Sequence, residues 1–173
     1  NTAIGHQALY SNITGSANTA IGKNALYYNT ASGNTAVGHS SLLDNLTGIH
    51  NTSVGDAALQ SNNGSDNTAV GKSSLLENYS GSYNTALGSE SMKNFLNGNY
   101  NTAVGFSAMR GGYEVSTHHN TAVGYQALNA ISGGHNNTST GSISLLALTT
   151  GSGNTASGFS SLNATTTGSH NTG

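Results

Sequence analysis

A nine-residue unit, Asn-Thr-Ala-Val-Gly-x-x-Ala-Leu, recurs along the chain, and a polar stretch follows each copy. Asn-Thr pairs open the copies at residues 1, 18, 34, 51, 67, 84, 101, 120, 137 and 154, and another begins at 171. Counted from this Asn, position 5 is Gly, positions 3 and 8 are Ala or Ser, and position 9 is Leu or Met in all ten complete copies. Spacings of 16 to 19 residues indicate a repeat architecture.

The pattern within each copy predicts strands and loops. Positions 2 to 4 form a short run with two-fold alternation, which places positions 2 and 4 on one face and positions 3 and 5 on the other. Helical spacing of apolar residues is missing, and Gly and Asn are too frequent for helices. Positions 7 to 9 predict a second short extended piece, and positions 10 to 17 predict a polar loop that absorbs length variation. We therefore expect an all-β parallel β-solenoid (β-roll) of ten 16–19-residue coils.

Stacked coils would place equivalent residues in ladders about 4.8 Å apart. We expect the Asn side chains at position 1 to stack along the axis and the Thr side chains at position 2 to form a row. Gly at position 5 would supply positive φ or a close backbone approach at a bend.

The composition changes this picture by limiting the core. The apolar share is 34%, charged residues make up 6%, and Cys, Pro and Trp are absent. Ordering a backbone residue costs about 1–2 kcal/mol, whereas burying one Val and one Leu per coil returns only about 3–6 kcal/mol. Because Ala and Ser imply a thin interior, we expect the larger side chains at positions 4 and 9 to pack against other copies of the chain. These candidates are Ile4, Leu9, Ile21, Leu26, Val37, Leu42, Val54, Leu59, Val70, Leu75, Leu87, Met92, Val104, Met109, Val123 and Leu128.

The unit, seen in full at residues 120–128, resembles repeats in the shafts of bacteriophage tail-fibre proteins. It is also similar to the Asn-Ser-x-Ala-Ile-Gly-type repeats in the head of trimeric autotransporter adhesins. The second resemblance implies a left-handed β-roll in which three chains share one core. The first implies an extracellular shaft on a virion that presents a receptor-binding tip for host attachment, with other fibre or baseplate proteins and a cell-surface glycan or protein receptor as partners.

Residues 1–173 would then be a single repeat array, a segment of a longer fibre, because the sequence starts and stops in the same phase of the repeat. A bacterial trimeric surface adhesin is the alternative with the same mechanics. An ice-binding solenoid is an alternative of another class, although position 4 carries mainly Ile or Val where an ice-binding plane would need a second Thr column.

Charge and motifs exclude several functions. Four Lys and Arg and a net charge of -2 leave no basic footprint for nucleic acid or anionic lipid. No apolar run is long enough to insert into a membrane. Nucleophile-elbow, phosphate-loop and Cys/His catalytic spacings are missing, so we expect no enzyme activity and no cofactor.

Histidine and acidic side chains are the remaining candidates for a metal site or a catalytic site. His50, His119 and His170 each precede an Asn-Thr pair, and in a trimer such residues could converge on Zn or Fe. We expect no metal site, because the spacing disagrees: position 6 holds His6 and His39 but also Lys23, Asp56, Lys72 and Tyr125, which marks it as a solvated position. Asp44 and Glu77 both occupy position 11, two coils and about 10 Å apart, which approaches the carboxylate separation of inverting glycosidases. A glycan-cleaving tail spike is therefore another alternative, although no aromatic-lined sugar groove is evident.

The seventh copy is the longest, at 19 residues, and carries the only Arg. A functional interpretation is a surface loop that contacts a receptor or a neighbouring fibre component. Its candidate contact residues are Arg110, Tyr113, Glu114, His118 and His119. We favour the simpler interpretation, a tolerated insertion, because lengthening a surface loop costs little.

Overall fold

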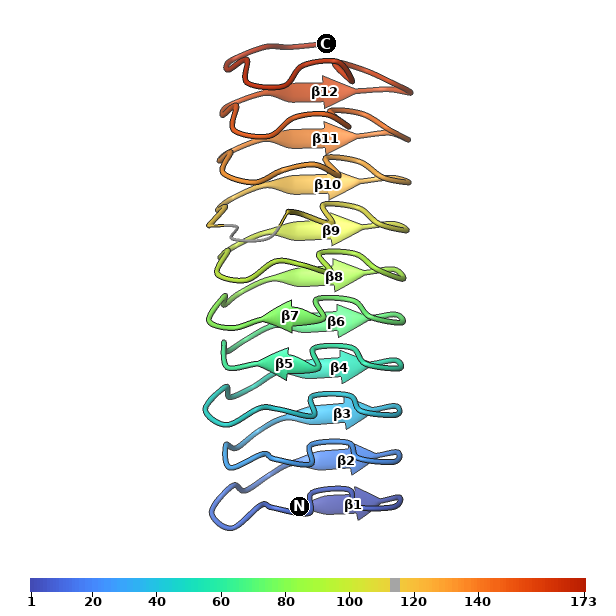
Figure 1. Ribbon diagram of the computed structural model, residues 1–173, viewed down its shortest axis with the longest axis vertical. Helices are drawn as coiled ribbons and strands as arrows, with labels where there is room; N and C mark the ends of the chain where they lie inside the picture. The colour runs from blue at the N-terminus through green and yellow to red at the C-terminus, as the bar shows by residue number, and fades with distance from the viewer. Residues whose placement is uncertain (113–115) are drawn as a thin grey trace.

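A computed structural model describes residues 1–112 and 116–173 and shows a parallel β-solenoid (Figure 1). Its three-residue strands stack in one ten-stranded parallel sheet, so about nine turns separate the first strand from the last. The sheet order is β1 (Thr2–Ile4), β2 (Thr19–Ile21), β3 (Thr35–Val37), β4 (Thr52–Val54), β6 (Thr68–Val70), β8 (Thr85–Leu87), β9 (Thr102–Val104), β10 (Thr121–Val123), β11 (Thr138–Thr140) and β12 (Thr155–Ser157). Strands β5 (Ser61–Asn62) and β7 (Glu77–Asn78) form a second, two-stranded parallel sheet. The described residues contain no helix.

The register of the large sheet follows the repeat. Thr2 pairs with Thr19, and each later pairing likewise joins residues of the same position. The chain therefore rises steadily, and its two ends lie at opposite ends of the column (Figure 1). Predicted strands, parallel pairing and stacking of equivalent positions are confirmed.

Alternation along each strand separates the interior from the surface. Ala20, Ala36 and Ala69 at position 3 are fully buried, whereas the flanking Thr and aliphatic residues face outward. Where Ser replaces Ala, its hydroxyl finds an internal acceptor: Ser53 Oγ donates to the carbonyl of Ala58 over 2.8 Å. The small side chains thus fit a thin interior, as predicted.

Gly at position 5 makes the corner after each strand. Its φ lies between 128° and 139° in the ten copies, a region that L side chains rarely adopt. A Cβ added at Gly105 would lie 2.4 Å from the carbonyl oxygen of Gly124 in the next coil. Both predicted reasons for Gly, positive φ and close approach, therefore hold at the same residue.

Positions 7 to 9 form a turn, so the prediction of a second extended piece is wrong. Residues at positions 7 and 9 have left-handed backbones, such as φ 59° at Asn24 and φ 53° at Leu26. Left-handed φ is unfavourable for residues with a Cβ. Hydrogen bonds between coils offset that cost here: the Leu26 amide donates to the Ser41 carbonyl over 3.0 Å, and the Asn24 amide to the His6 carbonyl over 2.9 Å.

Length variation falls in the loop, as predicted, and its place is specific. In a 17-residue copy the Asn45 side chain donates to the carbonyl of Gly48, three residues later. In a 16-residue copy Asn62 makes the same bond to Gly64, two residues later. The shorter copy therefore lacks one residue between the interior Asn and the Gly carbonyl that it binds, and the next coil keeps its register.

Candidate interaction surface

A buried ladder of Asn side chains at position 1 holds the coils together from inside. Asn84 is 1% exposed, and its Oδ1 accepts from the backbone N–H of Asn101 in the next coil over 3.0 Å. Its Nδ2 donates to the carbonyl of Gly98 over 2.7 Å. The same pair of bonds recurs from Asn1 to Asn154. Each amide therefore satisfies one backbone donor and one backbone acceptor that no strand partner reaches.

A second buried Asn ladder, at position 12, was not predicted. Nδ2 of Asn45 donates to Oδ1 of Asn29 over 2.8 Å, and Nδ2 of Asn62 donates to Oδ1 of Asn45 over 3.0 Å. In later coils this buried position holds Phe95, Ile131 or Leu148 instead. The stretch expected to be polar loop thus contributes a second row of interior residues. The recurrence of Asn at position 12 in the first five copies was the available signal.

The structure divides the predicted intersubunit residues into two sets. At position 9, Leu26, Leu59 and Met109 are fully buried among residues of the same chain, as are the equivalents in the other central coils. Leu9, in the first coil, packs against the same core and is partly buried. The assignment of position 9 to contacts with another chain is therefore wrong, because the left-handed turn directs these side chains into the coil's own interior.

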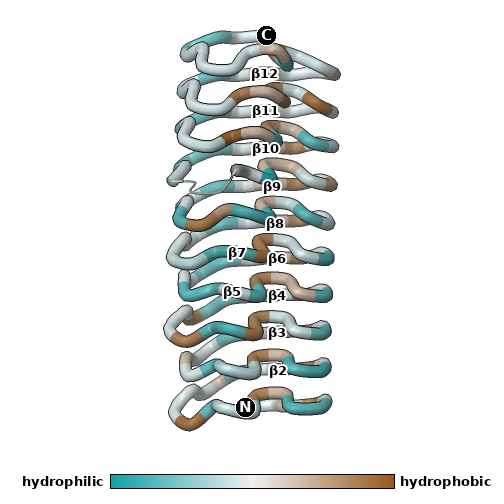
Figure 2. The backbone as a smooth tube through the Cα atoms, in the orientation of Figure 1, coloured by the Kyte–Doolittle hydropathy of each residue, from teal (hydrophilic) through white to brown (hydrophobic). Residues whose placement is uncertain are grey.

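Position 4 faces outward along the ten-stranded sheet. Relative exposure is 58% at Ile4, 38% at Val70 and 37% at Val123, with similar values at Ile21, Val54 and Leu87. Val37 and Val104 are half-buried. We call this row of eight residues the aliphatic column. Apolar segments recur at corresponding places in many successive turns of the chain (Figure 2).

The Thr residues at position 2 form a second column on the same face, two residues before the aliphatic column on every strand. The face therefore carries one row of hydroxyl groups beside one apolar row. In the last two strands the apolar row ends, because position 4 is Thr140 and Ser157 there.

The candidate contact residues of the seventh copy do not form one described cluster. Tyr113 and Glu114 lie outside the described residues. The Arg110 Nε lies 3.6 Å from the Glu90 carboxylate, which also lies 3.4 Å from the Lys93 Nζ. His119 stacks on Tyr100 at 5.0 Å between ring centroids. Arg110 and His119 are thus directed toward neighbouring coils.

His118 belongs to a ladder of side-chain acceptors. Its Nδ1 accepts from the backbone N–H of Asn99 over 3.1 Å, and the Nδ1 of His135 accepts from the N–H of His118 over 3.1 Å. The two rings stack at 5.3 Å. Both acceptor nitrogens must be unprotonated for these bonds. Desolvation by burial, followed by the fields of His135 and His119, lowers the pKa of His118 below its ordinary value of 6.5.

The structure also shows where the histidines and acids considered for metal binding and glycan cleavage lie. Among the described residues, no three His, Asp or Glu side chains lie close enough to share a metal ion. Asp44 bridges to Ser61, which pairs with Glu77, so the two acids do lie in one column two coils apart. Burial raises the pKa of the Asp44 carboxyl above its ordinary value. In the part of the chain that the structure describes, no helix could cross a membrane.

Comparison with protein-family models, with curated proteins and with solved structures finds no match to this chain. The architecture and the surface just described are therefore the observations from which a function can be argued.

Proposed function

We propose that this chain is a non-enzymatic structural shaft of an extracellular fibre, a viral tail fibre. In this proposal its ten coils rise roughly 43 Å from first to last strand at the spacing of parallel strands. Three copies associate side by side and hold a receptor-binding tip away from the particle. This proposal rests on two features of the structure. Buried amide side chains close the interior within one chain, and the aliphatic column runs along the outside of eight consecutive strands of the sheet.

The aliphatic column is the surface through which we expect the copies to associate. Fully burying a Val or Ile stabilises by about 1.5–3 kcal/mol, so covering the remaining exposed third contributes roughly 0.5–1 kcal/mol per residue. Eight such residues in each chain yield several kcal/mol, and the regular spacing lets identical columns match over their whole length. The resulting trimer packs three closed coils through their outer faces, in place of the single shared core implied by the adhesin resemblance.

The oligomer is tested by placing charge on the column. The double variant Val54→Asp and Val70→Asp is expected to be a folded monomer by light scattering, whereas the unchanged chain has three times that mass. The matched control, Ile13→Asp with Leu46→Asp, changes two apolar residues that are 90% and 51% exposed on the loops, and it is expected to remain trimeric. A trimeric mass for the column variant would reject association through this face.

The fibre assignment is tested separately from the oligomer. Antibodies against the chain are expected to decorate the tail fibres of virus particles in electron micrographs. Decoration of bacterial cells, with none on particles, would assign the chain to a surface adhesin instead.

A further inference from the structure

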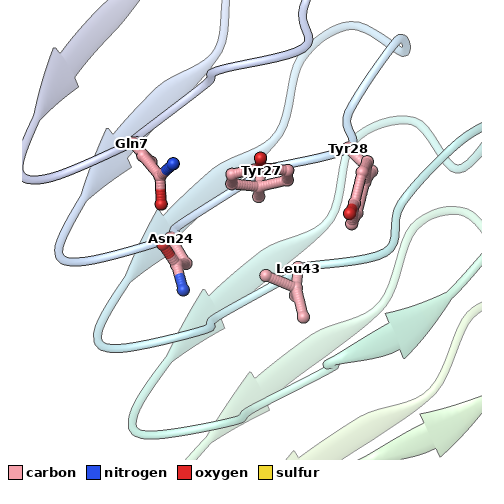
Figure 3. A pocket seen from close by; sticks show the side chains of 5 residues that line it. All are labelled: Gln7, Asn24, Tyr27, Tyr28 and Leu43. Atoms are coloured by element: carbon pink, nitrogen blue, oxygen red, sulfur yellow. The ribbon is translucent and has the colours of Figure 1, made fainter.

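A small pocket opens on the outer side of the first three coils, away from the ten-stranded sheet. Its lining residues come from positions 7, 10 and 11: Gln7, Asn24, Tyr27, Tyr28 and Leu43 (Figure 3). Its volume is about 250 Å³. Pockets for drug-sized ligands start at roughly 300 Å³, so this one admits a ligand the size of a single sugar ring.

Tyr27 and Tyr28 form an aromatic wall of the pocket, and Tyr10, which does not line it, stacks on Tyr27. The rings of Tyr27 and Tyr28 meet edge to face at 4.4 Å and 71°, and Tyr10 stacks on Tyr27 at 5.1 Å. Tyr28 is 48% exposed. The wall therefore presents apolar ring surface together with phenolic hydroxyls, the amphipathic combination found where a ligand has both apolar and polar faces.

Two amide side chains, Gln7 and Asn24, also line the pocket. In Figure 3, Gln7 and Asn24 lie one above the other, and the ring of Tyr27 lies between Gln7 and Tyr28. The Oδ1 of Asn24 is buried and has no hydrogen-bond partner among the described residues. Primary amides both donate and accept, so the Gln7 amide and the Asn24 Nδ2 can hydrogen-bond hydroxyl groups of a ligand.

This combination of side chains is specific to the first three coils. Position 7 is Ser in four of the other eight copies, and only the first two copies carry Tyr at position 10. None of the five lining residues is charged, which favours a neutral ligand over an anionic one.

We propose that this pocket binds a neutral sugar residue of a surface polysaccharide, with the pyranose ring against Tyr28 and its hydroxyls bonded to Asn24 and Gln7. The shaft would then contribute weak, lateral contacts to a glycan in addition to spacing a tip. The pocket lies outside the aliphatic column, so the proposal stands whether or not the chain forms a trimer.

Saturation-transfer NMR on the whole chain tests this with the methyl glycosides of glucose, galactose, mannose and N-acetylglucosamine as probes. At least one glycoside is expected to receive saturation, with signals reduced tenfold or more by Tyr28→Ala and by Asn24→Ala. The control Tyr125→Ala removes a tyrosine of similar exposure, 51%, from a distant coil and should leave the signals unchanged.

Circular dichroism establishes that each variant keeps its fold. The absence of a saturation-transfer signal from all four glycosides would overturn the proposal. So would signals that survive both pocket substitutions, or signals that the Tyr125 control reduces equally.

Discussion

Replacing Asn84 with Ala removes one rung of the interior amide ladder and leaves two buried backbone groups without partners. These are the N–H of Asn101, which donates to Asn84 Oδ1 over 3.0 Å, and the carbonyl of Gly98, which accepts from Nδ2 over 2.7 Å. An unsatisfied buried polar group costs about 1–3 kcal/mol, so the two together should lower the free energy of unfolding by about 2–6 kcal/mol.

Asn97 provides a matched control in the same coil. It is exposed, and its Oδ1 accepts only from Ser80 Oγ, over 2.8 Å. Asn97→Ala should therefore change the free energy of unfolding by less than about 0.5 kcal/mol, as surface substitutions usually do.

Urea denaturation compares the midpoints of the two variants, and hydrogen exchange follows the Asn101 amide directly. That amide should lose protection in Asn84→Ala and keep it in Asn97→Ala. Equal midpoints for the two variants, with Asn101 still protected, would refute the claim that the buried amides hold the coils together.

Further predictions concern the corner, acid sensitivity and length. Gly105→Ala should prevent normal folding, because its Cβ would meet the Gly124 carbonyl at 2.4 Å, whereas Gly112→Ala should be nearly neutral; melting curves compare them. Because the folded pKa of His118 is lowered, its contribution to stability is present above pH 6.5 and is lost as pH falls from there toward the folded pKa. His118→Gln should flatten that part of a melting-temperature profile, and an unchanged profile would contradict the assignment. Deleting residues 84–100, one whole coil, should shorten the particle by about 4.8 Å in small-angle scattering without unfolding it.

Much of the fold can be predicted from the sequence because the repeat is nearly exact. A fixed spacing of Asn-Thr pairs dictates that Thr2 lies beside Thr19, and a Gly in every copy marks the corner. Strand alternation correctly places position 3 inside and position 4 outside. These features depend on local preference and period, which a single sequence displays directly.

The inward direction of Leu26 and the other position 9 residues could not be predicted in the same way. Local preference disfavours φ 53° at a Leu, and only the hydrogen bonds between stacked coils make it favourable. The interior Asn ladder at position 12 recurs in the first five copies, but Asn is also a common loop residue, so its burial could not be predicted from a polar stretch. The pocket at Tyr27 and Tyr28 combines side chains of three coils, so no single copy of the repeat contains it.

Each chain closes its own interior with position 9, and we propose that position 4 faces a partner chain. Met109→Asp and Val104→Asp place the same charge on one coil, on a fully buried and a half-buried side chain respectively. Circular dichroism with light scattering should show that Met109→Asp loses the fold, whereas Val104→Asp keeps its β spectrum and weakens the oligomer. A folded, dissociated Met109→Asp variant would contradict the account, since it would place position 9 between chains.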